Sequence, residues 1–272
     1  MMKSPPRLQL APNIQDQVLI LPFITAIWLI QAAAHPHQAQ AIKQASQDNG
    51  SEVARLAGAL DSSDMEERRN AVLALAMLQT PAAAPALLSA LNDRSEIVRA
   101  LAVTGLGNLG DSAFVPALAE RLARDRSVLV RKSAAYALGR LRSREATPAL
   151  LRALREKNAE VRGAAAVALG QYEDAAAIAE LTRSLSDKAD FVRAQAAHAL
   201  GVNGPAAARA VPVLINMLTS DKAPEARRQA AIALGRIGER AALPALEEAK
   251  FSADPYLSQA ALAAIAALKA ER

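Results

Sequence analysis

The feature that most constrains this chain is a ten-residue sequence that returns about every 31 residues. It reads VRKSAAYALG from Val130, and its copies keep the same frame of valine, arginine, spaced alanines and a final Ala-Leu-Gly. The copies begin at Glu67, Val98, Val161, Val192, Ala226 and Leu257. The arginine position of the frame falls at Arg68, Arg99, Arg131, Arg162, Arg193, Arg227 and Ser258, with gaps of 31, 32, 31, 31, 34 and 31 residues. A fixed period of this size indicates a solenoid of repeated units, each of which packs only against its neighbours.

Each period contains two helical stretches. The first, such as PAAAPALLSAL from Pro81, places leucine and alanine at the spacing of an amphipathic helix, and the second contains the frame. One position of the first stretch is usually proline, which suits the first turn of a helix or marks a kink. These prolines are Pro85, Pro116, Pro148, Pro212 and Pro244. We expect the frame glycine, as in Gly139 and Gly201, to end the second helix in a left-handed cap. Because 52% of the residues are apolar and only 3% aromatic, the core must consist of alanine, leucine and valine.

This pattern, with an aspartate six residues before the frame arginine, resembles the HEAT repeat. More narrowly, it is similar to the short HEAT-like repeat of phycobilisome lyases, over about Ser51 to Arg272. The resemblance implies an all-α, right-handed solenoid of about seven two-helix repeats. In that family the aspartate and the arginine stack along the array as a structural ladder.

In this chain the ladder would join residues six positions apart. The expected pairs are Asp93 with Arg99, Asp125 with Arg131, Asp187 with Arg193, and Asp221 with Arg227, while Arg162 follows Glu156 in the fourth repeat. Ser62, Ser252 and Ser258 replace ladder residues in the terminal repeats. We therefore expect the ladder to weaken towards both ends, where repeats cap the core.

The first 41 residues do not follow the repeat. Residues 18–34 carry no charge, Lys3 and Arg7 precede them, and Ala39-Gln40-Ala41 provides a small-x-small site. These features predict a secretory signal peptide over residues 1–41, cleaved after Ala41 or alternatively after Ala34, with a short polar segment at 42–50. The mature chain would then be periplasmic or secreted. An uncleaved membrane anchor through residues 18–34 is the alternative, and a segment that is neither is a third interpretation.

The composition leaves little room for catalysis or for a cofactor. There is no cysteine, which excludes disulfides and thiolate metal sites, and the part after residue 41 keeps one histidine, His198, and no His-Glu dipeptide. The iron chemistry of HEAT-like deoxyhypusine hydroxylases is therefore not expected, and we predict no catalytic residue, metal or cofactor. GLGNLG at Gly105 to Gly110 matches a dinucleotide fingerprint, but it lies at the end of a second helix rather than after a strand.

The basic balance of the chain is modest. It has 32 lysines and arginines against 27 aspartates and glutamates, interspersed, for a net charge of +5. Of the extra cations beside the ladder, Arg69, Lys132 and Arg228 are the ones expected to be available for an acidic partner. Three such residues are weak evidence for phosphate binding, so a nucleic-acid partner is not favoured.

The remaining place for function is the free face of the second helices, at offsets +2, +5 and +9 from the frame arginine. Residues at these offsets vary in size and polarity, and in the family the second helices line the concave side of the superhelix, where partners bind. We define the predicted patch as Asn108, Tyr136, Arg140, Gln171, Gln195, His198, Gln229 and Arg236. The sequence thus favours a non-catalytic scaffold that binds a protein or peptide. Two alternatives stay open: a phycobilin lyase or chaperone-like factor for phycobiliproteins, and a nucleic-acid-binding solenoid.

Overall fold

The computed structural model describes residues 50–172 and 174–270. The chain divides into two units, Met1–Ala54 and Arg55–Arg272. In the first unit the described residues, 50–54, are helical. The predicted signal peptide and both cleavage sites lie outside the described residues, so export and location stay predictions.

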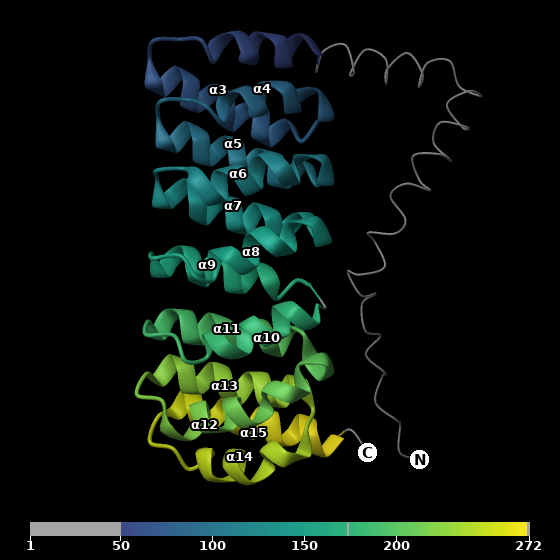
Figure 1. The fold of residues 1–272 in the computed structure, drawn as a ribbon, viewed down its shortest axis with the longest axis vertical. Helices are drawn as coiled ribbons and strands as arrows, with labels where there is room; N and C mark the ends of the chain where they lie inside the picture. The colour runs from purple at the N-terminus through teal and green to yellow at the C-terminus, as the bar shows by residue number, and fades with distance from the viewer. Residues whose placement is uncertain (1–49, 173, 271–272) are drawn as a thin grey trace, which may run out of the picture. The chain divides into compact units, whose positions relative to one another are not determined.

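The second unit is a stack of helix pairs in which the order along the chain is also the order along the stack (Figure 1). Helix and 3-10 turns account for the regular structure of the described residues, and no strand occurs among them. The predicted all-α solenoid is confirmed. The described residues form seven helix pairs, which we number as repeats one to seven.

In each repeat a short first helix is followed by a longer second helix. In the second unit the first helices are residues 55–59, α4 (Ala84–Ala90), α6 (Val115–Arg124), α8 (Thr147–Ala153), α10 (Ala175–Ser184), α12 (Val211–Ser220) and α14 (Leu243–Ala249). The second helices are α3 (Met65–Leu78), α5 (Glu96–Leu109), α7 (Val128–Leu141), α9 (Ala159–Leu169), α11 (Asp190–Val202), α13 (Pro224–Ile237) and α15 (Pro255–Ala270). Consecutive second helices pack against one another, and the first helices form a parallel row beside them.

The frame prolines lie at the start of the first helices, as one of the two sequence interpretations proposed. Each is the second residue of an α-helix, where its missing N–H breaks no helical hydrogen bond. A 3-10 turn comes directly before each of these helices: η2 (Pro81–Ala83), η3 (Ser112–Phe114), η4 (Arg144–Ala146), η5 (Gly204–Ala210) and η6 (Arg240–Ala242).

The predicted role of the frame glycine as a left-handed cap is wrong. Gly139 lies inside α7, and the left-handed residue that ends this helix is Arg142, with φ of 49°. A Cβ atom on Gly139 would lie 2.8 Å from Cα of Ala168 in α9. The glycine is therefore needed because two second helices approach more closely than a side chain would allow.

This contact recurs at every junction between consecutive second helices. The pairs are Ala76 with Gly105, Gly107 with Ala137, Gly139 with Ala168, Gly170 with Ala199, Gly201 with Ala233, and Gly235 with Ala264. Each pair contains one glycine and one alanine. In the first pair the alanine belongs to the earlier helix and the glycine to the later one, whereas the other five pairs have the opposite order. Fully buried leucines, one or more from nearly every helix, fill the space between the two rows, as Leu87, Leu106 and Leu138 do. The result is a closely packed row of second helices at regular spacing.

Candidate functional site

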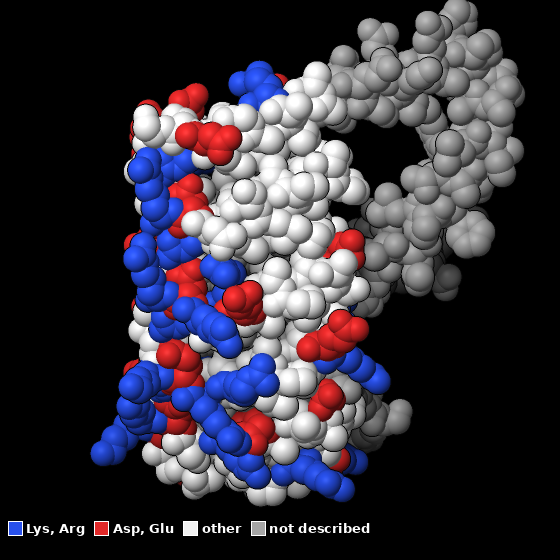
Figure 2. Space-filling model, turned by 45° about the horizontal axis from the view of Figure 1, so that its top comes forward, with Lys and Arg blue, Asp and Glu red and all other residues white. Residues whose placement is uncertain are grey.

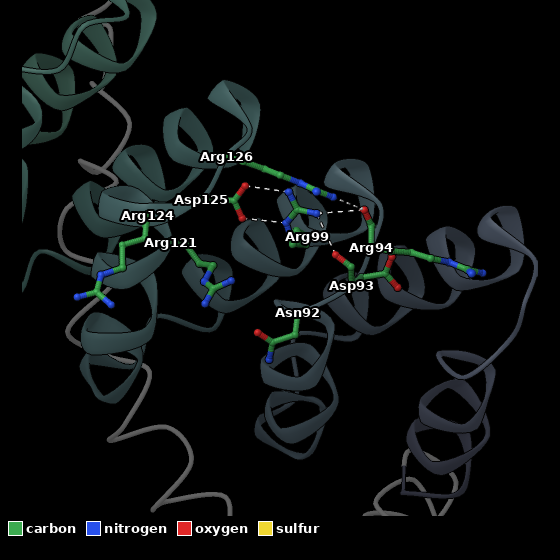
Figure 3. A pocket seen from close by; sticks show the side chains of 8 residues that line it. All are labelled: Asn92, Asp93, Arg94, Arg99, Arg121, Arg124, Asp125 and Arg126. Carbon is green, nitrogen blue, oxygen red and sulfur yellow. Dashed lines mark hydrogen bonds and ion pairs between the residues drawn. The ribbon is translucent and has the colours of Figure 1, made fainter.

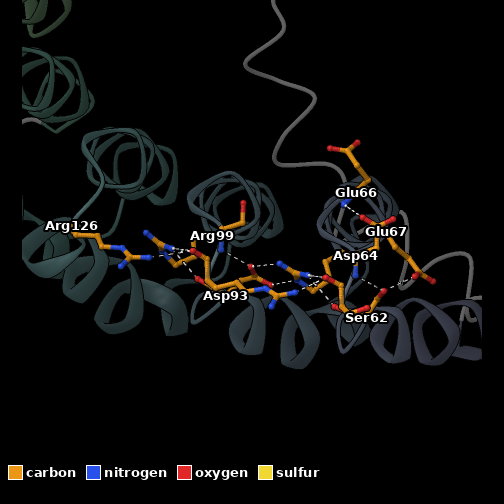
Figure 4. A network of polar contacts seen from close by, with 11 residues as sticks. Ser62, Asp64, Glu66, Glu67, Asp93, Arg99 and Arg126 are labelled. Carbon is orange, nitrogen blue, oxygen red and sulfur yellow. Dashed lines mark hydrogen bonds and ion pairs between the residues drawn. The ribbon is translucent and has the colours of Figure 1, made fainter.

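The charged ladder fixes the loops between first and second helices, and its geometry is clearest at Arg99. Nε and Nη2 of Arg99 donate to the two carboxylate oxygens of Asp125 in the next repeat, both at 2.8 Å. Nη1 of the same side chain donates to the backbone carbonyl of Asp93, at 2.9 Å, in its own repeat (Figure 4). One arginine thus holds its own loop and the following repeat together.

The predicted pairing within a repeat is wrong, because each ladder carboxylate binds the arginine of the preceding repeat. We call each such bridge a rung. The rungs are Arg68–Asp93, Arg99–Asp125, Arg131–Glu156, Arg162–Asp187 and Arg193–Asp221. In repeats two to five the acidic residue six positions back offers only its backbone carbonyl to the arginine, as Asp125 does to Arg131. Its carboxylate accepts the amide of the residue two positions on, as from Ser127, which turns it towards the preceding repeat.

The rungs keep their carboxylates ionised despite burial. Burial alone would raise the pKa of Asp125, but the hydrogen bonds from Arg99 and from the amide of Ser127 outweigh it, so the pKa is lowered from the ordinary value of 3.8. The pKa of Asp93 and that of Asp187 are lowered by the same balance. In Asp221 the hydrogen bond from Arg193 is the dominant cause of the lowered pKa.

The ladder does not weaken equally at its ends, contrary to expectation. In repeat one, Arg68 forms a full rung with Asp93. Ser62, six positions back, accepts a further hydrogen bond from Arg68 through its backbone carbonyl. In repeat six, Arg227 forms no ion pair with a described residue, and its Nε donates to the carbonyl of Leu218 instead.

The neighbouring Arg228, instead of Arg227, forms the ion pair with repeat seven. It pairs with Asp254 at 2.9 Å, and its guanidinium lies 5.0 Å from the ring centroid of Tyr256. Arg69 pairs with Glu66, and Lys132 pairs with Glu160. The three cations expected to be available for an acidic partner are therefore engaged within the chain.

The predicted patch lies on consecutive second helices, with Gln171 directly after α9. Tyr136, Arg140, Gln171 and Arg236 are exposed, and Tyr136 keeps 41% of its surface accessible. The other four residues, Asn108, Gln195, His198 and Gln229, are half-buried. Partner binding by these residues stays a prediction.

Exposed apolar side chains extend the same face. Leu73 and Met77 of α3 and Val202 of α11 occupy the patch offsets and are 43%, 73% and 44% exposed. Two acceptor atoms of the patch, Oδ1 of Asn108 and Oε1 of Gln229, are buried without a hydrogen-bond donor among the described residues. The face therefore combines polar and apolar groups.

Sequence reasoning missed a cluster of arginines at another edge of the stack. The string RLARDR from Arg121 to Arg126 was the available signal, and the structure places its side chains around a depression between repeats two and three. In the described part of the chain no group of three or more His, Cys, Asp or Glu side chains is arranged to hold a metal ion. Across residues 50–172 and 174–270, every helix is too short or too polar to span a membrane.

Comparison with known proteins agrees with this architecture. A family model described as HEAT repeats matches residues 52–129, 115–201 and 192–269. The structure of YibA from E. coli is similar, with 23% identity over 80% of this chain and 81% of that chain and a TM-score of 0.59. So is the complex of CpcE and CpcF of phycocyanin lyase from Nostoc, with 25% identity over 78% of this chain and 93% of that chain and a TM-score of 0.51. Human deoxyhypusine hydroxylase in complex with glycerol gives 22% identity over 80% and 85%, with a TM-score of 0.42. No curated protein matches the sequence.

Proposed function

This chain belongs to the HEAT-repeat family, and we propose that it is a non-catalytic scaffold that binds a protein or peptide along its second helices. The observation that carries the proposal is the exposed pair Tyr136 and Arg140 at the centre of a regular row of helices. The two side chains are four residues apart on α7, so they lie on one helical face. Tyrosine and arginine are the residue types that most often dominate binding energy in protein interfaces.

The rungs and the glycine contacts support this proposal because they hold the second helices at fixed spacing. A partner that spans several repeats meets a preformed surface, and little free energy is lost in ordering it. Leu73, Met77 and Val202 on the same face offer apolar contacts beside the polar patch. Such a mixture is typical of protein-binding surfaces rather than of surfaces that track a phosphate backbone.

The proposal is tested by placing a photo-crosslinking residue at position 136 and identifying the protein captured in cells. Binding of that partner is then measured for a variant with Tyr136→Ala and Arg140→Ala. We expect a loss of affinity of about tenfold or more, as for central interface residues. The matched control carries Arg240→Ala, an exposed arginine of a turn outside the patch, and should bind as the wild type does. Equal binding by the patch variant would disprove the assignment of the patch.

We further propose that the scaffold acts in the periplasm or outside the cell, after removal of residues 1–41. The support is the uncharged run at 18–34 followed by Ala39-Gln40-Ala41. Intact mass of the protein from each cell fraction tests this. A soluble exported species that begins at Ile42 or His35 supports export, and a full-length species in membranes would favour an anchor. A full-length species in the cytoplasm would refute the location.

The alternative function is that of a phycobilin lyase or chaperone-like factor. The similarity to the CpcE–CpcF complex of phycocyanin lyase is the observation in its favour. The chain is mixed with apo-phycocyanin and free bilin, and covalent attachment is followed by absorbance after denaturation. We expect no attachment, and bilin transfer would put the lyase function in place of the scaffold.

A further inference from the structure

A depression of about 350 Å³ lies between repeats two and three, at the edge where first helices turn into second helices (Figure 3). Its lining residues are Asn92, Asp93, Arg94, Arg99, Arg121, Arg124, Asp125 and Arg126. Five of these are arginines and two are aspartates. The question is how much of the positive charge is already neutralised.

The aspartates are fully used by the ladder. Asp125 accepts both hydrogen bonds of the Arg99 fork and the amide of Ser127. Asp93 accepts the Arg68 fork in the same way, so neither carboxylate is left for the other arginines. Four guanidinium groups, which we call the arginine cluster, remain around the depression without a rung: Arg94, Arg121, Arg124 and Arg126.

The remaining contacts of the arginine cluster are mostly with neutral backbone groups. Arg94 donates to the carbonyl of Ser63, Arg121 to that of Leu91, and Arg126 to that of Arg94. Arg124 makes no hydrogen bond or ion pair with a described residue. The one ion pair between the cluster and a described residue joins Nη2 of Arg121 to the carboxylate of Glu120, which is 55% exposed, at 3.7 Å. The cluster therefore carries a largely uncompensated positive charge.

Exposed apolar side chains follow two of these cations along the chain. Ile97 and Leu129 lie three residues after Arg94 and Arg126, in the first turns of α5 and α7, and are 42% and 39% exposed. Arg94 and Arg126 each come directly after a ladder carboxylate. The same position in the next three repeats is an exposed lysine: Lys157, Lys188 and Lys222. Figure 2 shows lysine and arginine side chains in a row along one edge of the stack, with acidic side chains beside them.

We propose that this edge binds an acidic segment of a partner protein in extended conformation, with its carboxylates in the arginine cluster. Arginine forks match carboxylates in a bidentate geometry, and Ile97 and Leu129 provide contacts for apolar side chains between them. Packed helices lie roughly 8–10 Å apart, and an extended chain advances about 3.3 Å per residue. A carboxylate at about every third residue would therefore meet one repeat after another. A phosphate backbone would find aliphatic side chains here instead of rings on which bases stack.

The test uses the full chain as recovered from cells and a fluorescein-labelled 12-residue peptide with glutamate at every third position and leucine between. Fluorescence anisotropy at low salt is compared for the wild type and for a variant with Arg124→Gln and Arg126→Gln. We expect affinity to fall about tenfold or more, because two charge-assisted contacts are removed. The matched control carries Arg144→Gln and Arg240→Gln, two exposed arginines in turns at the opposite edge, and should stay within about twofold of the wild type.

Each other outcome would overturn the proposal. Absence of peptide binding by the wild type would do so, and equal loss in both double variants would mean an effect of net charge alone. Equal binding of a 12-nucleotide oligothymidylate would identify a phosphate-binding surface instead. Arg124→Gln alone is the variant that removes no contact with a described residue, so it keeps the test valid if the double variant unfolds. The Tyr136→Ala, Arg140→Ala variant should bind the peptide normally, so failure here leaves the proposed scaffold function standing.

Discussion

Helix α7 joins its two neighbours by different means. Towards α5 it uses one buried rung, in which the side chains of Arg99 and Asp125 are only 5% and 3% exposed and share two hydrogen bonds. Towards α9 its rung is a single contact of 3.3 Å between Arg131 and Glu156, whose side chain is 25% exposed. The glycine contact is nearly the same on both sides, with added Cβ atoms 2.7 and 2.8 Å from an alanine.

The junction between α7 and α9 has further polar contacts of its own. Lys132 pairs with Glu160 at 2.6 Å, and the hydroxyl of Tyr172 donates to the carbonyl of Leu138 at 2.7 Å. The extra methylene of glutamate explains the poorer rung, because the carboxylate no longer faces the fork squarely while it also accepts the amide of Asn158. The two junctions therefore differ in how deeply the rung is buried and in the side chains that accompany it, which are Arg121 and Arg126 at the first and Lys132 and Tyr172 at the second.

The largest expected effect is acid unfolding of the whole ladder. A carboxylate with a lowered pKa contributes stability above its ordinary pKa, and this is lost as the pH falls through the lowered value. With an ordinary value of 3.8 for aspartate, the urea midpoint should be level above pH 5 and fall steeply below pH 4. Urea titrations monitored by circular dichroism between pH 6 and pH 2.5 measure this. A constant midpoint down to pH 2.5 would contradict the account of the rungs.

Replacing one buried carboxylate should separate the two junctions. Asp125→Ala leaves the guanidinium of Arg99 buried and unpaired, and should cost about 3–5 kcal/mol of unfolding free energy. Glu156→Ala breaks a more exposed pair and should cost about 1 kcal/mol or less. Urea unfolding at pH 7 measures both. Equal costs would show that the two rungs do not differ as described.

The glycine contacts should instead behave alike at the two junctions. Gly107→Ala and Gly139→Ala each force a methyl group against an alanine of the next helix, and each should cost about 1–3 kcal/mol. Gly58→Ala is the control, because a Cβ there meets nothing within 4 Å and should be neutral or slightly stabilising.

The first junction, with Ala76 in the earlier helix and Gly105 in the later one, suggests a second substitution that compensates for Gly139→Ala. Combining Gly139→Ala with Ala168→Gly recreates that order and should recover part of the lost stability. Recovery can only be partial, because a Cβ at position 139 would still lie 2.8 Å from the Cα of residue 168. Thermal and urea unfolding of the single and double variants measure the recovery, and a double variant no more stable than Gly139→Ala would show that the methyl group of Ala168 does not contribute to the clash.

Tyr172→Phe removes the hydrogen bond to Leu138 and should cost about 1 kcal/mol. Burial raises the pKa of Tyr172 to about 12 from the ordinary 10. Its contribution is therefore present below pH 10 and lost as the pH rises through about 12. Unfolding at pH 8 and at pH 11 should show a smaller difference between wild type and variant at the higher pH.

The smallest expected effect is a gain. Glu156→Asp introduces the aspartate that the other rungs use. The acid follows the frame proline at the same distance here, from Pro148, as Asp93 follows Pro85 in repeat two. A bidentate fork with Arg131 should add about 0.5 kcal/mol. A urea midpoint equal to or below that of the wild type would mean that side-chain length does not limit this rung.

The period alone was enough to predict the architecture, because apolar positions that recur at fixed offsets can be buried only by stacking equivalent helices. The same regularity made the rungs ambiguous. Asp125 is six residues from Arg131 and 26 from Arg99, and spacing along one repeat gives no reason to prefer the distant partner. The frame glycine was misassigned for a related reason, since Gly139 lies near a helix end but its partner, Ala168, belongs to another repeat.

The arginine cluster could not be derived from offsets in the frame, because Arg121 and Arg124 lie on a first helix whereas Arg94 comes from the preceding repeat. Of the predicted patch, exposure could be anticipated for Tyr136 and Arg140 from the helical face. It could not be anticipated for His198 or Gln229, which are half-buried.

The direction of the rungs makes the array modular. Every internal repeat gives an arginine to the repeat after it and a carboxylate to the repeat before it. Excision or duplication of any one of repeats three to five would therefore join an arginine to a carboxylate of the same kind, and a glycine to an alanine. The number of repeats, and with it the length of surface offered to a partner, could change by recombination without any new core having to be invented.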